Sequence, residues 1–297
     1  GVVFGVGSVV AMLAVGEGAS AQALERIRRL GSNNIMLTAT KAVEETTGGQ
    51  VQRTSVYGLT YADEKRLRES FPSVKRIVPA KLVRKEARLG ERTLEVRVVG
   101  TTPEWFDLVP RRMLAGRELA AHDLASRSAV TVLTESGARK LLAVERSIGG
   151  FVRIGSFAFE VVGIVESDVG KIGDLPTPDQ EVDAYIPITV CRDRFGDISQ
   201  RRTSGSFERE QVELHQVIVE VDDTAHVEPT ADAITTMLKR FHKRVDYKVA
   251  VPLALLREAE ATKRTFNIVL GSIAGISLLV GGIGIMNIML ASVTERT

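Results

Sequence analysis

The sequence contains few cysteines and few aromatic residues, and its charges nearly cancel. Its 297 residues include one cysteine, Cys191, so neither an intramolecular disulfide nor a Cys-x-x-Cys site can form within the chain. Aromatic residues make up 5% of the chain, which is too sparse to indicate a stacking pocket. The 39 basic and 37 acidic residues are interleaved and leave a net charge of +2, so the composition gives no support for a nucleic-acid partner.

The motifs of common catalytic sites are also absent. The single Gly-Lys pair, Gly170-Lys171, lacks the upstream glycine and the following Ser or Thr of a phosphate-binding loop, and no G-x-S-x-G elbow occurs. The histidines are widely separated, without the spacing of metal ligands, and we expect them to be exposed or to cap helices; they are His122, His215, His226 and His242. The sequence therefore predicts no catalytic residue, cofactor or metal in this chain.

Charged residues are missing from both ends of the chain. Residues 1–16 and 265–294 contain no Asp, Glu, Lys or Arg, and all other charged residues except Glu295 and Arg296 lie in residues 17–264. As a helix, the C-terminal stretch would be about 42 Å long, which exceeds the roughly 30 Å hydrocarbon core of a bilayer. We therefore predict a transmembrane helix over 265–294 and the end of another over 1–16. A buried core helix is the alternative for the C-terminal stretch, and a signal peptide for the N-terminal one.

Helical patterns continue from these stretches toward the middle of the chain. We predict stalk helices over 17–31 and 252–264, with Gly31 as the C-cap of the first and Pro252 in the first turn of the second. No Gly/Ser linker intervenes, so both membrane helices are expected to be joined rigidly to the middle region.

The middle region alternates strand and helix patterns, which predicts an α+β domain. We expect helices at 60–74 and 225–241, the first capped by Thr60, and a hairpin of 150–155 with 157–166. Further strands are expected within 33–40, 74–83, 93–101, 129–134, 183–188, 211–223 and 245–251, with a helix after 134. Residues 110–123 are predicted to be a loop, and 167–182 and 195–210 to be mobile loops.

These loops suggest an insertion. We predict an inserted subdomain over 110–194 between two outer segments, 32–109 and 195–251. Helix–strand units after Thr60 and after Asp223 hint at a weak internal duplication of the outer segments. Trp105 and Phe106 are expected to be a buried packing anchor rather than a ligand site.

Basic residues gather in the second quarter of the chain. Because Glu86 and Glu91 are interleaved with them, a solvated face is favoured over a docking surface for an acidic partner. The basic residues are Lys75, Arg76, Lys81, Arg84, Lys85, Arg88 and Arg92, and a second group comprises Arg192, Arg194, Arg201 and Arg202.

Five stretches together carry a family resemblance. They are VVAMLAVGEGASAQALERIRRLGSNNIMLT, VVGTTPEWFDL, FVRIGSFAFEVVGIV, AYIPIT and FNIVLGSIAGISLLVGGIGIMNIMLASVTERT. The whole chain resembles the permease of MacB-type ABC transporters in the FtsX-like superfamily, and the last stretch is the most specific.

The resemblance implies an α+β extracytoplasmic domain, with a porter-like α/β part split by an inserted smaller subdomain, flanked by transmembrane helices. It implies a multi-pass protein of the inner (plasma) membrane in which an ABC ATPase domain or subunit, binding ATP and Mg²⁺, drives movement of the outer domain to export drugs, peptides or similar substrates. It implies a homodimer in contact with membrane lipid and, in an organism with two membranes, a periplasmic adaptor and an outer-membrane duct. A two-span sensory receptor and a lipoprotein-releasing permease of the same superfamily stay open as alternatives.

Small and polar residues in the apolar stretches are the candidate site residues. Small residues expose backbone for close helix approach, between subunits or within one; they are Gly1, Gly5, Gly271, Gly275, Ser277 and Gly281. Asn287 is an amide within the predicted span, which needs a polar partner unless it lies near the interface. Glu295 and Arg296 are expected to mark the cytoplasmic exit of the helix.

Overall fold

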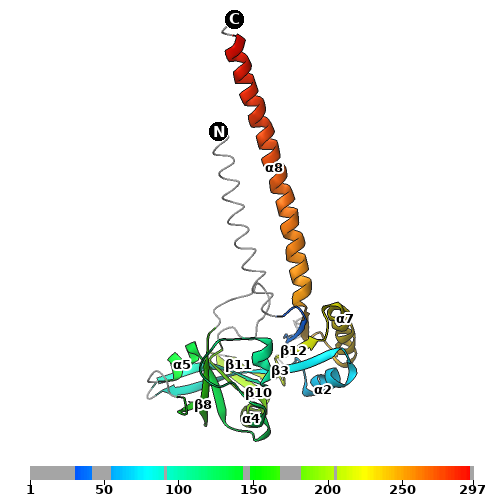
Figure 1. The fold of residues 1–297 in the computed structure, drawn as a ribbon. Coiled ribbons are helices and arrows are strands. Elements are labelled where there is room, and N and C mark those ends of the chain that lie inside the picture. The colour runs from blue at the N-terminus through cyan, green and yellow to red at the C-terminus, as the bar shows by residue number, and fades with distance from the viewer. Residues whose placement is uncertain are drawn as a thin grey trace. The chain divides into compact units, whose positions relative to one another are not determined.

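The structure is a computed structural model that describes residues 31–41, 55–89, 92–142, 148–167, 182–203 and 206–294, with the backbone alone at some of these positions. The chain divides into two compact units, one comprising Arg29–Leu253 and the other Gly1–Arg28 together with Ala254–Thr297. Every described strand belongs to the first unit, and the described part of the second unit is the long helix α8 (Pro252–Thr294) from Ala254 onward (Figure 1).

Two βαβ segments from opposite ends of the first unit build a four-stranded antiparallel sheet. The first comprises β1 (Asn34–Ala39), α2 (Tyr61–Ser70) and β3 (Val74–Leu89), and the second β12 (Gln216–Val221), α7 (Thr224–Phe241) and β13 (Tyr247–Ala250). The strand order is β13-β1-β12-β3, so each segment contributes one central and one flanking strand. This is a split βαβ arrangement, and it contains the predicted helix–strand units after Thr60 and after Asp223, while the internal duplication stays a prediction.

Local sequence signals explain both helices of this split βαβ part. Thr60 caps α2: its hydroxyl accepts a hydrogen bond from the Asp63 backbone N–H, while the Asp63 carboxylate accepts one from the Thr60 backbone N–H. This capping box satisfies two backbone donors that the first turn leaves unpaired. Asp223 caps α7 by accepting from the backbone N–H of Ala225. Both helices were predicted.

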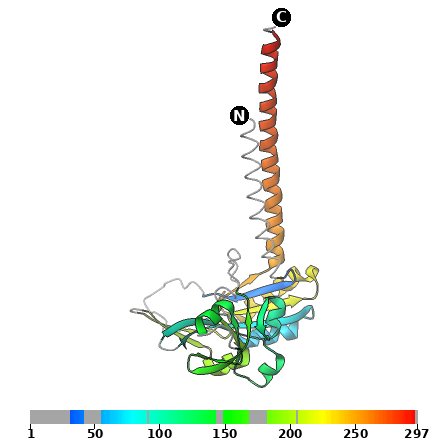
Figure 2. The ribbon, with the colours of Figure 1, turned by 60° about the vertical axis from the view of Figure 1, so that its left-hand side comes forward.

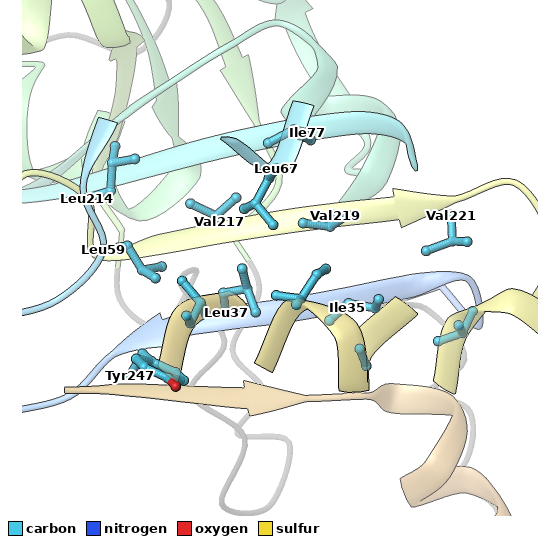
Figure 3. Packing of buried hydrophobic residues seen from close by; sticks show 14 residues of the cluster. Ile35, Leu37, Leu59, Leu67, Ile77, Leu214, Val217, Val219, Val221 and Tyr247 are labelled. Atoms are coloured by element: carbon cyan, nitrogen blue, oxygen red, sulfur yellow. The ribbon is translucent and has the colours of Figure 1, made fainter. Parts of the chain in front are cut away.

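The two helices cover one face of the four-stranded sheet and form a core with it. Alternate residues of the strands point at the helices, such as Ile35 and Leu37 of β1 and Val217 and Val219 of β12 (Figure 3). Leu67 of α2 packs in the same cluster, and α7 adds Val227, Ala231, Ile234 and Leu238.

Strand β3 continues beyond this sheet and carries the second part of the unit. Its later half pairs with β4 (Arg92–Thr101), and the sheet goes on through β9 (Ala184–Pro187), β6 (Val130–Thr134), β8 (Phe157–Val165) and β5 (Met113–Gly116). Strand β7 (Phe151–Ile154) forms the predicted hairpin with β8. In Figure 1, β3 reaches from the neighbourhood of α2 and α7 to the end of the unit that holds α5 and β8.

Short helices cover both faces of this second part, which we call the β4–β9 part. Neighbouring residues of β4 belong to different clusters, Val99 to one and Val98 to the other, because successive side chains of a strand point to opposite faces. Helix α3 (Glu104–Leu108) packs in the first cluster, and α5 (Glu135–Leu141) and α6 (Ile188–Phe195) in the second. The predicted boundaries at residues 110 and 194 stay a prediction.

Two predicted loops are wrong. Residues 110–123 contain the strand β5 and the start of α4 (Ala121–Ala125), and 195–210 contain β10 (Ile198–Thr203) and most of β11 (Ser206–Gln211). With β2 (Ser55–Val56), the strands β10 and β11 form a three-stranded sheet of order β10-β11-β2. The predicted mobile loop 167–182 lies mostly outside the described residues, as do the N-terminal span and the first stalk helix.

Helix α8 is one α-helix of 43 residues, continuous in both views (Figures 1 and 2). It begins at Pro252, as predicted, and several large apolar side chains along it are exposed, among them Phe266, Leu279 and Met289. Within the described residues, no helix combines the length and apolar content needed to cross a membrane. The predicted spans over 1–16 and 265–294 stay predictions, since the first lies outside the described residues and not every side chain of the second is described.

Candidate functional site

The predicted packing glycines of α8 lie on more than one face of the helix. At 3.6 residues per turn, Gly271 and Gly275 are about 40° apart around the axis, whereas Gly281 lies about 80° from Gly271 on its other side. A Cβ atom added at Gly271 or Gly275 would meet no described atom within 4 Å. The other predicted residues, namely Gly1, Gly5, Glu295, Arg296 and the side chains of Ser277 and Asn287, lie outside the described positions.

A set of buried and half-buried ionisable groups lies instead where α2, β3 and α6 meet. We call it the junction cluster; it comprises Tyr61, Lys81, Cys191, Asp197 and His215. Lys81 lies in the middle of β3, is 2% exposed, and donates from Nζ to an Asp197 carboxylate oxygen. The solvated face predicted for the basic residues is therefore wrong for Lys81, because β3 is paired on both edges and helices cover this face.

Asp197 joins three elements through one carboxylate. Its Oδ1 accepts from Lys81 of β3 and, at 3.2 Å, from the hydroxyl of Tyr61, the first residue of α2. Asp197 itself lies in the connection between α6 and β10, where Gly196 adopts φ +64° and turns the chain. Glycine adopts this backbone conformation without the Cβ clash that other residues meet.

Helix α6 is held against the same region by packing. Cys191 is fully buried over Gly100 of β4, the residue that pairs with Lys81 in the sheet. A Cβ atom on Gly100 would lie 2.4 Å from the Cβ of Cys191, so this approach requires glycine. The Arg192 guanidinium lies over the Tyr61 ring, 4.3 Å from its centroid, and adds a cation–π contact between α6 and α2.

Burial keeps the neighbours of this ion pair uncharged. It raises the pKa of the Cys191 thiol to about 12, and burial together with Asp197 raises the pKa of Tyr61. Burial and the charges of Lys81 and Arg84 lower the pKa of His215 from 6.5 to about 4. Near pH 7 the thiol and phenol are protonated and the imidazole is neutral, which suits the cluster to holding elements together and not to nucleophilic chemistry.

A second polar network ties the split βαβ part together. His242, the C-cap of α7, lies between two carboxylates, with Nδ1 2.7 Å from Asp246 and Nε2 3.0 Å from Asp63. Asp246 also accepts from the backbone N–H of Gly58, and Arg66 donates to Asp63. The network joins the start of α2, the end of α7 and the start of β13.

Of the other three histidines, two are exposed, as predicted, and one has a different role. His122 and His226 are exposed beside Asp123 and Asp222, whereas His215 is half-buried and its Nδ1 accepts from the Leu82 backbone N–H, a role that spacing alone did not indicate. No three His, Cys, Asp or Glu side chains among the described residues are placed to hold a metal ion. Trp105 and Phe106 are buried, as predicted.

The neutral state of the half-buried His215 predicts a pH dependence of stability. The folded chain resists protonating this ring, whereas the unfolded chain protonates it at about pH 6.5, so stability is fully present above that pH and falls as the pH approaches about 4. The difference corresponds to about 3 kcal/mol at about 1.36 kcal/mol per pH unit. We expect His215→Asn, which keeps an acceptor near Leu82, to flatten thermal unfolding temperature against pH in detergent between about pH 7 and pH 4.5. The exposed His226→Asn should keep the wild-type profile; equal profiles for wild type and His215→Asn would refute the assignment.

The fold is similar to the folds of two solved structures. It matches the crystal structure of the periplasmic region of MacB from Actinobacillus actinomycetemcomitans with a TM-score of 0.55 at 19% identity, covering 83% of this chain and 98% of that one. It matches the extracellular domain of the noncanonic ABC-type transporter YknZ from Gram-positive bacteria with a TM-score of 0.52 at 20% identity, covering 73% of this chain and 100% of that one.

Comparison of the sequence with known proteins shows the family of the chain. Residues 1–237 match the model of the MacB-like periplasmic core domain, and the chain belongs to that family. Over 100% of its length, it is 34% identical to the macrolide export ATP-binding/permease protein MacB of Hyphomonas neptunium, and 31% identical to the pyoverdine export ATP-binding/permease protein PvdT of Pseudomonas fluorescens. It spans 43% and 42% of these relatives, which is less than half of either.

Proposed function

We propose that this chain is part of the permease of an ABC-type exporter and couples ATP hydrolysis to movement of its extracytoplasmic domain. The observation that carries the proposal is similarity over the full chain to proteins named as export ATP-binding/permease proteins. The described residues add an argument from chemistry, because their buried ionisable groups join structural elements and are held in unreactive states.

The connection between β13 and α8 supports mechanical coupling. Only Val251 separates the end of β13 at Ala250 from the start of α8 at Pro252. A chain that passes from strand to helix without a Gly/Ser linker transmits movement, whereas a flexible linker would absorb it. In this proposal, α8 is the element through which an ATP-driven movement reaches the domain.

The charge-free part of α8 lies in the membrane in this proposal. Residues 265–294 contain no charged side chain, and the described large apolar side chains on this stretch are exposed, as lipid contact requires. The domain then faces the outside of the inner (plasma) membrane, in agreement with the periplasmic description of its family.

Other components follow from the relatives. ATP and Mg²⁺ would bind to an ATPase segment or subunit outside this chain, because the relatives combine ATP-binding and permease functions. Their names supply macrolides and pyoverdine as candidate substrate classes. We further propose that two copies pair, with the small residues of α8 as contact positions. In an organism with two membranes, an adaptor and an outer-membrane duct would complete the path.

Insertion of a flexible linker tests the coupling. Four Gly/Ser residues placed after Val251 in the full-length protein should lower substrate export more than about tenfold while ATP hydrolysis continues, because the movement is lost in the linker. The readouts are export into a trapping buffer and phosphate release, both from proteoliposomes that contain the ATPase.

The same insertion at the exposed turn around Gly149 is the matched control. Its φ is +82°, and no described atom would lie within 4 Å of an added Cβ, so the turn has room for extra residues. Export should persist in this variant. Unchanged export after the Val251 insertion would exclude mechanical coupling through α8, and a full-length protein without ATPase activity would favour the sensory-receptor alternative.

A further inference from the structure

Two parts of the first unit share one strand, and the junction cluster lies where that strand passes between them. The first half of β3 packs in the split βαβ core and its second half pairs with β4. Helix α2 belongs to the first part and α6 packs in the second. Asp197 follows α6 directly and contacts Tyr61 of α2 and Lys81 of β3.

The buried ion pair between Lys81 and Asp197 disfavours states in which the α6–β10 connection is only partly separated from β3. Lys81 is 2% exposed, and its Nζ donates to the Asp197 carboxylate and, at 3.4 Å, to the Val212 carbonyl. If the α6–β10 connection moved away, the ammonium group would lose its carboxylate while still surrounded by protein. Removing one partner of a buried pair is strongly unfavourable unless water reaches the charge that remains.

The carboxylate is the more solvent-accessible partner. The Asp197 side chain is 27% exposed, so it can regain water on separation, whereas Lys81 can be hydrated only when α6 also leaves the sheet. Opening is therefore expected to involve α6 and the Asp197 turn together, whereas the β10–β11 hairpin is itself paired with β2. The backbone hydrogen bond from Val212 N–H to the Asp197 carbonyl links the hairpin to the same turn.

We propose that Lys81, Asp197 and Tyr61 form a clamp that holds α6 and the turn at Asp197 against the split βαβ part and opens as one unit. The closed state is the one in the structure. In the open state, Lys81 and Asp197 are both hydrated and the contact between α6 and β4 is lost. This inference concerns the domain alone and holds whether or not the chain transports a substrate.

Cys191 reports on the clamp without an added label. It is the only cysteine of the sequence and is fully buried between α6 and Gly100. A thiol reagent reaches it only when α6 separates from β4, so the modification rate follows the open population. With the full chain in detergent and N-ethylmaleimide as the probe, mass spectrometry counts one modified site per chain.

Asp197→Asn is expected to raise the Cys191 modification rate at least tenfold, because the neutral amide no longer compensates Lys81. Asp193→Asn is the matched control: Asp193 lies on α6, is exposed, and pairs with Arg127, so its loss should leave the rate within twofold. Amide hydrogen exchange should rise in α6 and around residue 197 while α7 stays protected, which separates clamp opening from a change in thiol reactivity.

Two further variants keep the inference falsifiable if Asp197→Asn unfolds. Tyr61→Phe removes only the hydroxyl and should raise the rate about threefold. Lys81→Met combined with Asp197→Asn removes the uncompensated charge and should bring the rate back toward wild type. A wild-type rate in Tyr61→Phe, or equal exposure of α6 and α7 in the exchange measurement, would overturn the clamp.

Discussion

Replacing Trp105 with alanine is expected to lower the free energy of unfolding by about 3–5 kcal/mol, the range for deleting a large buried aromatic side chain. Trp105 is fully buried on α3, and its ring centroid lies 6.3 Å from that of Tyr185. The same cluster contains Val78 of β3 and Ile218 of β12, so the indole fills space between the split βαβ part and the β4–β9 part. A cavity there weakens both parts at once.

Thermal and chemical unfolding of the full chain in detergent measure this effect. Phe151→Ala is the control, because Phe151 is 73% exposed and its removal should change stability by no more than about 0.5 kcal/mol. Trp105→Phe should fall between the two: it loses part of the volume but also removes an indole N–H that has no hydrogen-bond partner among the described residues. Similar losses for Trp105→Ala and Phe151→Ala would contradict the assigned packing role.

Gly137→Ala is expected to destabilise the fold by about 3 kcal/mol, at the upper end for overpacking. Its added Cβ would lie 1.9 Å from the backbone oxygen of Asp183, far inside van der Waals contact. That backbone is held in place by hydrogen bonds. The Asp183 N–H donates to the Arg97 carbonyl, and the Asp183 carboxylate accepts from the Arg97 N–H and, at 2.7 Å, from Lys140 Nζ. Relief of this clash requires α5 to move away from β9.

Gly271→Ala provides the contrast for the same measurement. A Cβ added at Gly271 meets no described atom within 4 Å, and alanine favours an α-helix over glycine by about 1 kcal/mol, so this change should leave stability equal or higher. If both glycine substitutions give unfolding temperatures within about a degree of wild type, a Cβ at Gly137 does not clash with Asp183 as described.

Local signals in the sequence predicted the elements that depend on local interactions. The capping residue Thr60 identified the start of α2, alternating apolar residues identified the hairpin β7–β8, and Pro252 identified the start of α8. The family resemblance was also correct and is confirmed over the chain. In each case, the information lies within a few neighbouring residues or within one long, specific sequence motif.

Elements that depend on distant partners were missed. Strand β5 exists because it pairs with β8, about fifty residues further along the chain. Strands β10 and β11 pair with each other, and β11 with β2, within a segment, 195–210, whose Gly, Ser and Arg content is typical of loops. Helix α6, which carries Cys191 and Arg192, had no assignment.

The junction cluster was hidden for the same reason. Lys81 stands within a run of basic residues that usually face water, and its carboxylate partner lies 116 positions away in sequence. The partial burial of His215, just before β12, likewise follows from the pairing of β12 with β3, which spacing between histidines does not encode. Ionic contacts of this kind become visible only when the strand order is known.

The pairing of β1 with β13 determines how a pulling force enters the domain. The chain enters the sheet at Asn34 and leaves it at Ala250, and the register Met36 with Ala250 brings this entry and exit to the same end of two hydrogen-bonded neighbours. Displacements that separate these two ends load the Met36–Ala250 position first, so the four paired positions open one after another from that end instead of resisting together in shear. Equal displacements instead carry both strands, and the sheet behind them, along as one body.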